Sequence, residues 1–237
     1  MIYVYAITAG SPPREALDGV PGLAEARLAA RAVRDVAAVY SEIAKSPSPT
    51  RKAALRHEQV VEQLMAGRPL LPARFATVLG DEATLERLLT ANHDRLAAGL
   101  ERVRDCVELG VRVMWDAAGT EVDPPSEEPA GGATSGTAYL MARAERERRR
   151  RGTEARAAEL SANLDRLFRP CARDGVVRVL PSPQFVMAAA YLVPRGQTGE
   201  FRSRVNEAGA AFETLKLLCS GPWPPYHFVP ELEVPRG

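Results

Sequence analysis

The chain has three histidines and three cysteines, residue types that often bind metals or act as nucleophiles. They are His57, His93 and His227, and Cys106, Cys171 and Cys219. No cysteine or carboxylate stands at metal-ligand spacing around the histidines, and the cysteines form no C-x-x-C pair. We therefore interpret the histidines as surface or boundary residues and the cysteines as small buried hydrophobes. The sequence predicts no metal site.

No motif for nucleotide binding or nucleophilic catalysis is present either. Gly131-Gly132 lies in an acidic stretch, and it neither follows a predicted strand nor opens a helix with a Lys-Ser/Thr pair. The chain contains no G-x-S-x-G elbow. We expect no cofactor and no enzymatic activity. A small-molecule enzyme or sensor stays an alternative, which would require a pocket with convergent polar groups.

The densest charge is the run Arg148-Arg149-Arg150-Arg151. Such a run can contact RNA or phospholipid. Here Glu145, Glu147 and Glu154 interleave with the arginines, and no aromatic residue stands nearby to stack on bases. We interpret the run as a solvated helix face, with a protein contact as its functional alternative. An RNA-binding module remains a third hypothesis, although we expect no nucleic-acid partner.

Two further segments combine residue types that a plain core or loop does not explain. Leu71-Pro72-Ala73-Arg74-Phe75 places a proline and an arginine inside an apolar stretch. It is interpreted as an edge strand with an ion-paired arginine at a domain boundary, or as a functional segment. Ser220–Val229 holds Trp223, Tyr226 and Phe228 among three prolines, which lower the entropy lost on docking. This tail either fills a groove of its own chain or docks a partner.

The composition of the chain limits the class of protein to which it can belong. The chain has 237 residues, 46% hydrophobic and 26% charged, with a formal net charge of +1, so a strong global attraction to polyanions is excluded. The longest apolar run, 185–193, is half of what a membrane-spanning helix needs. The opening Met1-Ile2-Tyr3-Val4-Tyr5 lacks a basic region and predicts a strand rather than a signal peptide. We expect a soluble cytoplasmic protein with no membrane partner.

The first part of the chain, residues 1–105, predicts an α/β domain. Strands are expected at 2–9, 28–33 and 35–40, and Ser48 or Thr50 can cap a helix that starts at Arg51 and ends at Gly67. Residues 70–79 are expected to be extended. From Gly80-Asp81 to about residue 105, leucines at helical spacing predict one helical region.

The second part, residues 106–220, alternates strand and helix patterns. Strands are expected at 109–115, 175–180, 184–193 and 212–219, and helices at 137–168 and 199–209, with a flexible linker at 117–136. The order βαββαβ is that of a ferredoxin-like fold, whose first and third strands are central. The third strand here is the most apolar, as a central strand should be. The fold class is thus α+β, with two α/β domains and an aromatic and proline-rich tail at 221–237.

Four stretches of the chain resemble the gas vesicle protein F/L family (GvpF/GvpL). They are Tyr3-Val4-Tyr5-Ala6-Ile7, Leu71–Val78, Thr137-Ala138-Tyr139-Leu140 and Gly221–Val229. The last is the most specific, because a tryptophan in a string of prolines rarely arises by chance. The chain departs from the family at Ala76, where glycine usually follows Arg-Phe. Alanine makes a backbone with positive φ less favourable at this position.

The resemblance implies a non-enzymatic accessory protein needed for gas vesicle assembly, located in the cytoplasm and at the gas vesicle. It also implies contacts with the small hydrophobic shell protein and with other accessory proteins. No catalytic residues can be transferred. We expect the tail to pack near Leu71, Pro72 and Phe75, where Arg74 could donate to tail carbonyls. The candidate protein-binding residues are therefore Leu71, Pro72, Arg74, Phe75, Trp223, Tyr226 and Phe228.

Overall fold

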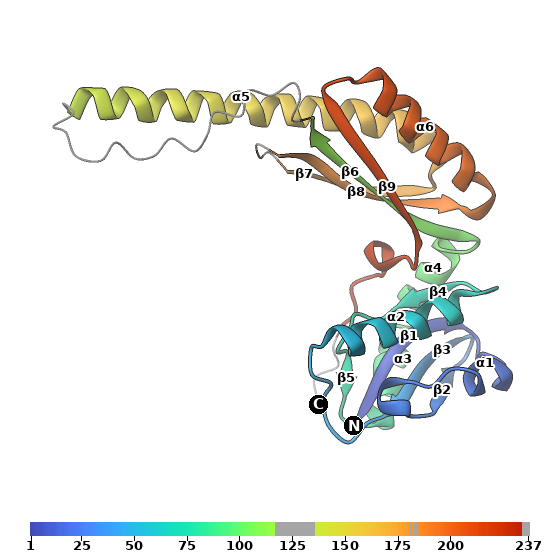
Figure 1. The fold of residues 1–237 in the computed structure, drawn as a ribbon. Helices are drawn as coiled ribbons and strands as arrows, with labels where there is room; N and C mark the ends of the chain where they lie inside the picture. Colours follow the sequence, from blue (N-terminus) through green and yellow to red (C-terminus); the bar gives the residue numbers. More distant parts are fainter. Residues whose placement is uncertain (117–135, 181, 183, 234–237) are drawn as a thin grey trace. The chain divides into compact units, whose positions relative to one another are not determined.

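A computed structural model describes residues 1–116, 136–180, 182 and 184–233 of the chain (Figure 1). The residues divide into two compact units, Met1–Glu108 together with Gly221–Gly237, and Leu109–Ser220. The predicted linker, 117–136, lies outside the described residues as far as 135, and helix α5 begins at Gly136.

The first unit is built on a sheet in which β1 (Ile2–Ala9) is central. It lies between β3 (Val36–Glu42) and β4 (Leu70–Pro72), with β2 (Leu28–Val33) outside β3. The two-residue strand β5 (Val78–Leu79) also pairs with β1. All of these pairings are antiparallel.

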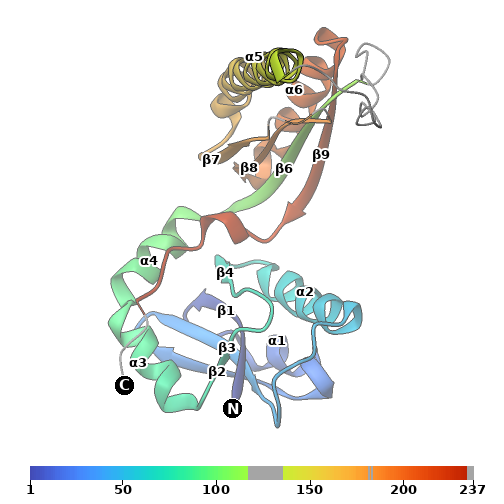
Figure 2. The same cartoon turned by 90° about the vertical axis from the view of Figure 1, so that its left-hand side faces the viewer.

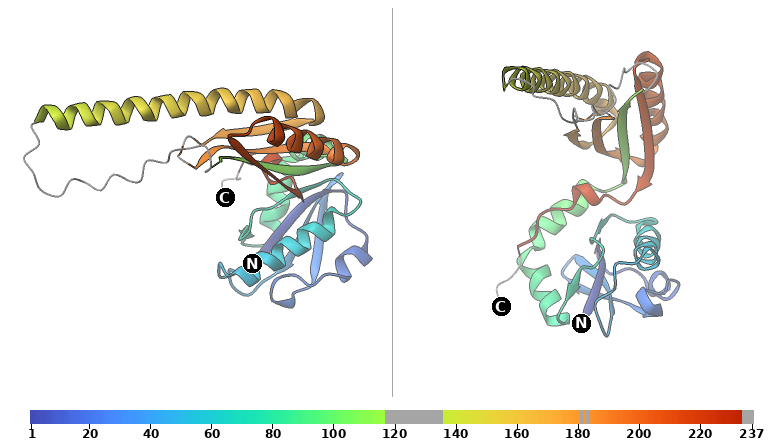
Figure 3. Two further views of the ribbon diagram at one scale, coloured as in Figure 1. Left: turned by 45° about the horizontal axis from the view of Figure 1, so that its top comes forward. Right: turned by 60° about the vertical axis from the view of Figure 1, so that its left-hand side comes forward.

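Helices cover both faces of this sheet, as Figures 2 and 3 show. Helix α2 (Arg51–Met65) lies on one face, and α3 (Glu82–Ala91) and α4 (His93–Arg102) lie on the other. A short helix, α1 (Arg14–Asp18), follows β1. Because β1 is covered on both sides, seven of its eight residues are buried, and its apolar character is continuous rather than alternating.

Polar side chains cap the helices of this unit. Thr50 accepts a hydrogen bond from the backbone N–H of Ala53 at 3.2 Å, and Asp81 accepts one from Thr84 at 2.7 Å. The expected helical region after Asp81 is confirmed, as two helices rather than one continuous helix. The helix breaks at Asn92, whose φ and ψ of −112° and 11° are not helical, and α4 starts a new direction there.

The second unit holds a sheet in the order β7-β8-β6-β9. Its strands are β6 (Cys106–Trp115), β7 (Asp174–Val179), β8 (Phe185–Pro194) and β9 (Leu215–Trp223). The expectation that the apolar strand at 184–193 is central is confirmed. Helices α5 (Gly136–Phe168) and α6 (Thr198–Ala211) lie on one face of this sheet (Figures 1 and 2).

Aromatic packing closes the core of the second unit. Phe168 of α5, Tyr191 of β8 and Phe201 of α6 contact one another with ring centroids 5.2–6.0 Å apart. Leu109, Val111 and Val113 point into the same core from alternate positions of β6.

Candidate functional site

The segment at 70–79 lies on the first unit as two short strands joined by a turn. In β4, Leu71 pairs with Ile7 and Pro72 with Ala6, and both Leu71 and Pro72 are buried. Proline is tolerated because β4 is an edge strand, where a missing N–H costs no ladder hydrogen bond. The expectation of one continuous extended stretch is wrong, because a turn at Phe75-Ala76 interrupts it; β4 and β5 run in the same direction, both antiparallel to β1.

The turn depends on a left-handed residue at Ala76, whose φ is 66°. The expectation that alanine makes a positive φ less likely here is not met: the backbone adopts one, and alanine bears the strain. Hydrogen bonds hold the strained backbone: the Ala76 N–H donates to the Tyr3 hydroxyl at 3.1 Å. The N–H and hydroxyl of Thr77 both donate to the Arg74 carbonyl, at 3.1 and 2.7 Å. Together these bonds offset a left-handed cost of about 1–2 kcal/mol.

Behind the turn lies a buried aromatic cluster centred on His57. The prediction of a surface or boundary residue is wrong for this histidine, which is 2% exposed. Its Nε2 donates to the Ala73 carbonyl at 3.0 Å, and its Nδ1 accepts from the Tyr3 hydroxyl at 2.9 Å. Its ring also stacks on Tyr5 and meets Phe75 edge-on. Phe75 thus anchors the turn from inside.

Burial controls the protonation of this cluster. Desolvation lowers the pKa of His57 and raises the pKa of Tyr3 to about 12. Both groups are therefore neutral near pH 7. A neutral His57 is also what the hydrogen bonds require, since Nδ1 must accept from Tyr3.

The last strand of the chain begins and ends later than the sequence predicted. Strand β9 runs from Leu215 to Trp223 rather than from 212 to 219, because Phe212 still closes helix α6. Trp223 therefore ends a strand, and it is 41% exposed. A short 3-10 helix, η4 (Tyr226–Phe228), follows it and lies against β4.

Two tail aromatics contact the first unit in different ways. The Tyr226 hydroxyl donates to Oε2 of Glu58 on α2 at 3.1 Å, and burial, reinforced by that carboxylate, raises the pKa of Tyr226. Phe228 is buried, with the guanidinium carbon of Arg102 5.4 Å from its ring centroid. Arg74, which we expected to donate to the tail, has an exposed side chain.

Residues that the sequence analysis missed fix the rest of the tail. Glu108, 5% exposed, accepts the backbone N–H of His227 at 2.9 Å and its Nδ1–H at 2.7 Å. Buried Asn92 binds the backbone of Glu233. The missed signals were a lone acid in an apolar strand pattern, and an asparagine in the row Leu85, Leu89, Asn92, Leu96.

The tail and β4 border an apolar hollow of about 500 Å³ on the first unit. We use "the hollow" for this feature. Four of the seven candidate residues line it: Leu71, Pro72, Arg74 and Tyr226. Phe75 and Phe228 lie in the packing behind it, and Trp223 is not part of its wall. The other lining residues are Val4, Ile7, Ala73, Thr77, Leu79, Leu85, Leu88, Leu96, Val229, Pro230, Glu231 and Leu232.

The hollow suits apolar binding rather than acid-base chemistry. Its lining is mostly aliphatic, and its charged members are Arg74 and Glu231. Across the described parts of the chain, no three His, Cys, Asp or Glu side chains gather as a metal would require. Within the same residues, no helix has both the length and the apolar character needed to cross a bilayer.

Comparisons with known proteins identify relatives over nearly the whole chain. A family model described as gas vesicle synthesis protein GvpL/GvpF matches residues 1–230. Gas vesicle protein L of Streptomyces sp. (strain CB03234) is 36% identical over 185 residues, covering 74% of this chain and 68% of that protein. Gas vesicle protein L2 of Halobacterium salinarum is 29% identical over 225 residues, covering 84% and 78%.

Two solved structures share the fold. The crystal structure of GvpF from Anabaena sp. PCC7120 has a TM-score of 0.76 at 20% identity, covering 97% of this chain and 96% of that one. GvpF from Microcystis aeruginosa gives 0.71 at 20% identity, covering 97% and 99%.

Proposed function

The chain belongs to the gas vesicle synthesis protein GvpL/GvpF family, and from that membership we propose that it is a non-enzymatic accessory protein of gas vesicle assembly. In this proposal it works in the cytoplasm and at the forming vesicle. It binds the small hydrophobic shell protein in a chaperone-like manner, and it contacts other accessory proteins.

The hollow is the observation that carries this proposal. A strongly apolar subunit aggregates unless its surface is covered before assembly. An aliphatic hollow of about 500 Å³ can accept a bulky apolar side chain of such a subunit. Burying one such side chain contributes about 1.5–3 kcal/mol, which suits reversible holding rather than permanent capture.

The remaining candidate residues take supporting roles in the proposal. Arg74 is exposed at the rim of the hollow and places a positive charge there. Phe75 and Phe228 keep β4, the turn and the tail in place from behind. Trp223, half-exposed at the end of β9, is proposed as a separate contact for a protein partner.

We also propose a domain assignment to go with this role. Residues 1–105 form the α/β domain that carries the hollow, and the tail after Trp223 completes its wall. Residues 106–220 form a ferredoxin-like domain, which the strand order β7-β8-β6-β9 and the placement of both helices on one face support.

Co-purification with the shell protein tests the proposal. The full chain, tagged, is co-expressed with the shell protein, and bound shell protein is quantified. Leu88→Lys and Leu232→Lys place charge in the hollow at half-buried positions, and Arg74→Glu reverses the charge at the rim. The matched control is Leu55→Lys, at an exposed leucine of α2 outside the hollow. Circular dichroism confirms that each variant is folded.

We expect the hollow variants to lose most bound shell protein, by about tenfold, and the control to retain it. Trp223→Ala, measured beside them, tests the separate contact. If folded Leu88→Lys, Leu232→Lys and Arg74→Glu all retain as much shell protein as Leu55→Lys, the hollow is not the binding site.

A further inference from the structure

The first half of helix α5 extends past the strands of its own sheet (Figure 1). We call Tyr139–Arg151 the arm. Every side chain of the arm except Glu147 is exposed, whereas Ala157, Ser161, Leu164 and Phe168 farther along the same helix are buried. The arm therefore has no packed face within the described part of the second unit.

Ion pairs within the helix help to keep the arm helical. Glu145 pairs with Arg148 and Arg149 at 3.0 and 3.2 Å, and Glu147 pairs with Arg150 and Arg151, both at 2.8 Å. The hydrogen bonds from Arg150 and Arg151 lower the pKa of Glu147 to about 2. Pairs at this spacing support a helix that is otherwise marginal on its own.

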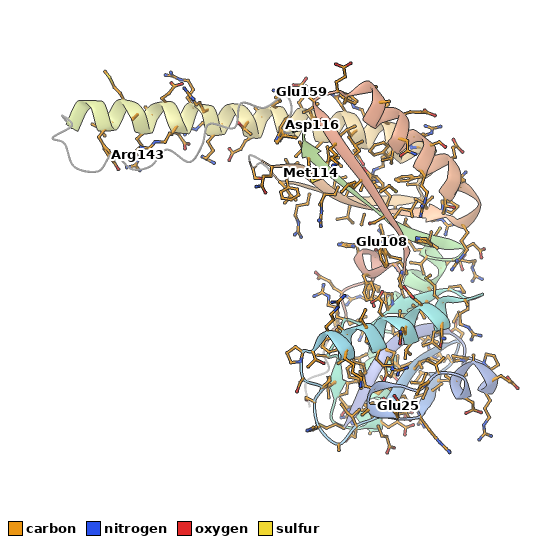
Figure 4. All side chains as sticks on the ribbon, in the orientation of Figure 1. Glu25, Glu108, Met114, Asp116, Arg143 and Glu159 are labelled. Atoms are coloured by element: carbon orange, nitrogen blue, oxygen red, sulfur yellow. The ribbon has the colours of Figure 1, made fainter. Side chains whose placement is uncertain are left out.

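One row of the arm contains two arginines outside these pairs, Arg143 and Arg146, together with the paired Arg150. Each residue of this row lies 18 positions before a buried residue of the same helix. The row is Tyr139, Arg143, Arg146 and Arg150, and the buried residues, in the same order, are Ala157, Ser161, Leu164 and Phe168. That spacing is about five helical turns, so both rows lie on one face of α5. The face that covers the sheet thus continues beyond it as a tyrosine and three arginines. Figure 4 labels Arg143, and none of the ion pairs found among the described residues includes Arg143 or Arg146.

We infer that this row is a docking surface for an acidic helix of a partner protein, which lies along the arm where the sheet ends. The arm carries six arginines and two glutamates, so its excess charge favours an acidic occupant and disfavours a second arm. The row's arginines, spaced by three and four residues, match carboxylates on one helix face, and guanidinium binds carboxylate with two parallel hydrogen bonds. A nucleic acid fits less well, because glutamates flank the arginines and Tyr139 is the arm's one aromatic residue.

The test uses the full chain and a designed helical peptide of about 18 residues with glutamates along one face. A peptide of the same composition, with glutamates spread around the helix, controls for charge alone. Binding is measured by fluorescence anisotropy at low salt, with a single-stranded RNA as the competing class of ligand. Arg143→Gln/Arg146→Gln removes the unpaired arginines, and Arg148→Gln/Arg151→Gln makes the same charge change elsewhere on the arm.

The one-face peptide should bind about tenfold more tightly than the control peptide. Arg143→Gln/Arg146→Gln should weaken that binding about fivefold to tenfold, and Arg148→Gln/Arg151→Gln by less than about twofold. Circular dichroism of both double variants checks helicity. Equal losses in the two double variants, equal binding of the two peptides, or tighter binding of RNA than of the one-face peptide would each overturn the inference.

Discussion

The side-chain amide of Asn92 pairs with the backbone of Glu233 in both directions, across 141 positions of sequence. Nδ2 donates to the Glu233 carbonyl at 2.9 Å, and Oδ1 accepts the Glu233 N–H at 2.8 Å. The amide thus imitates one rung of a β-ladder at the break between α3 and α4. Arg95 adds an ion pair to the Glu233 carboxylate at 2.8 Å. This end of the tail is held by a side chain that is itself buried.

Asn92→Ala should loosen the tail. It removes both hydrogen bonds to Glu233, and also the one from Nδ2 to the Leu88 carbonyl; each contributes about 0.5–1.5 kcal/mol. Hydrogen exchange in residues 226–233 should become faster, while exchange in β1 stays slow. Asn206→Ala, at an exposed position of α6, should leave the exchange of the tail unchanged. Unchanged tail exchange in Asn92→Ala would show that apolar packing alone holds this segment.

Gly99→Ala should lower the free energy of unfolding by about 1 kcal/mol, although alanine favours helices. A Cβ at Gly99 would lie 3.1 Å from Leu71 Cδ1 and 3.2 Å from Pro230 Cδ, so the tail would have to shift. Gly152→Ala is the matched control, because a Cβ there meets nothing within 4 Å. We expect it to stabilise α5 by up to about 1 kcal/mol. Urea denaturation of both variants measures the difference, and equal gains would contradict close packing of the tail on α4.

Ala76→Gly should stabilise the protein by up to about 1 kcal/mol. Glycine relieves the left-handed strain at φ 66°, and the added freedom of the unfolded chain cancels part of the gain. Ala54→Gly, at an exposed position within α2, should instead cost about 1 kcal/mol. Thermal melts of the two variants should therefore move in opposite directions. A lower melting temperature in Ala76→Gly would mean that the turn is unstrained.

His57 should make the protein less stable as the pH falls below about 6.5, the pKa of an unfolded histidine. Burial lowers its pKa in the folded state, so the unfolded chain takes up the proton first. The contribution is present above the unfolded pKa and is lost as the pH falls toward the folded one. Denaturant midpoints between pH 8 and about pH 5.5, above most carboxyl titrations, should show this loss in the wild type and less of it in His57→Gln.

His93 provides a control of opposite sign. Hydrogen bonds to Asp94 and Asp35 raise its pKa, so its contribution is present at low pH and is lost as the pH rises through the folded pKa. His93→Gln should therefore make the loss on acidification steeper. The same slope in both variants would show that another group controls the pH dependence.

The sequence by itself determined where most regular elements form. Hydrophobic spacing and capping residues are local signals, so Ile2–Ala9, the Thr50 cap and the central apolar strand follow from the pattern of neighbours. It also singled out Leu71, Pro72 and Arg74 in one segment and Tyr226 in a distant one, and all four line one hollow. Local patterns failed where a distant partner outweighs local preference. Ala76 adopts a positive φ because Tyr3 accepts its N–H, and His57 is buried because Tyr3 and Ala73 satisfy both ring nitrogens.

Only the tertiary structure decided what holds the tail and which helix face is left uncovered. Glu108 and Asn92 bind His227 and Glu233, which lie more than a hundred positions away in the sequence. The spacing of neighbouring residues does not predict such a pairing. The sequence predicts a helix for the arm of α5 and also for the half of α5 that packs on the sheet. The two halves differ because the strands end beneath one of them, and the length of a sheet depends on the pairing of strands rather than on the helix that covers it.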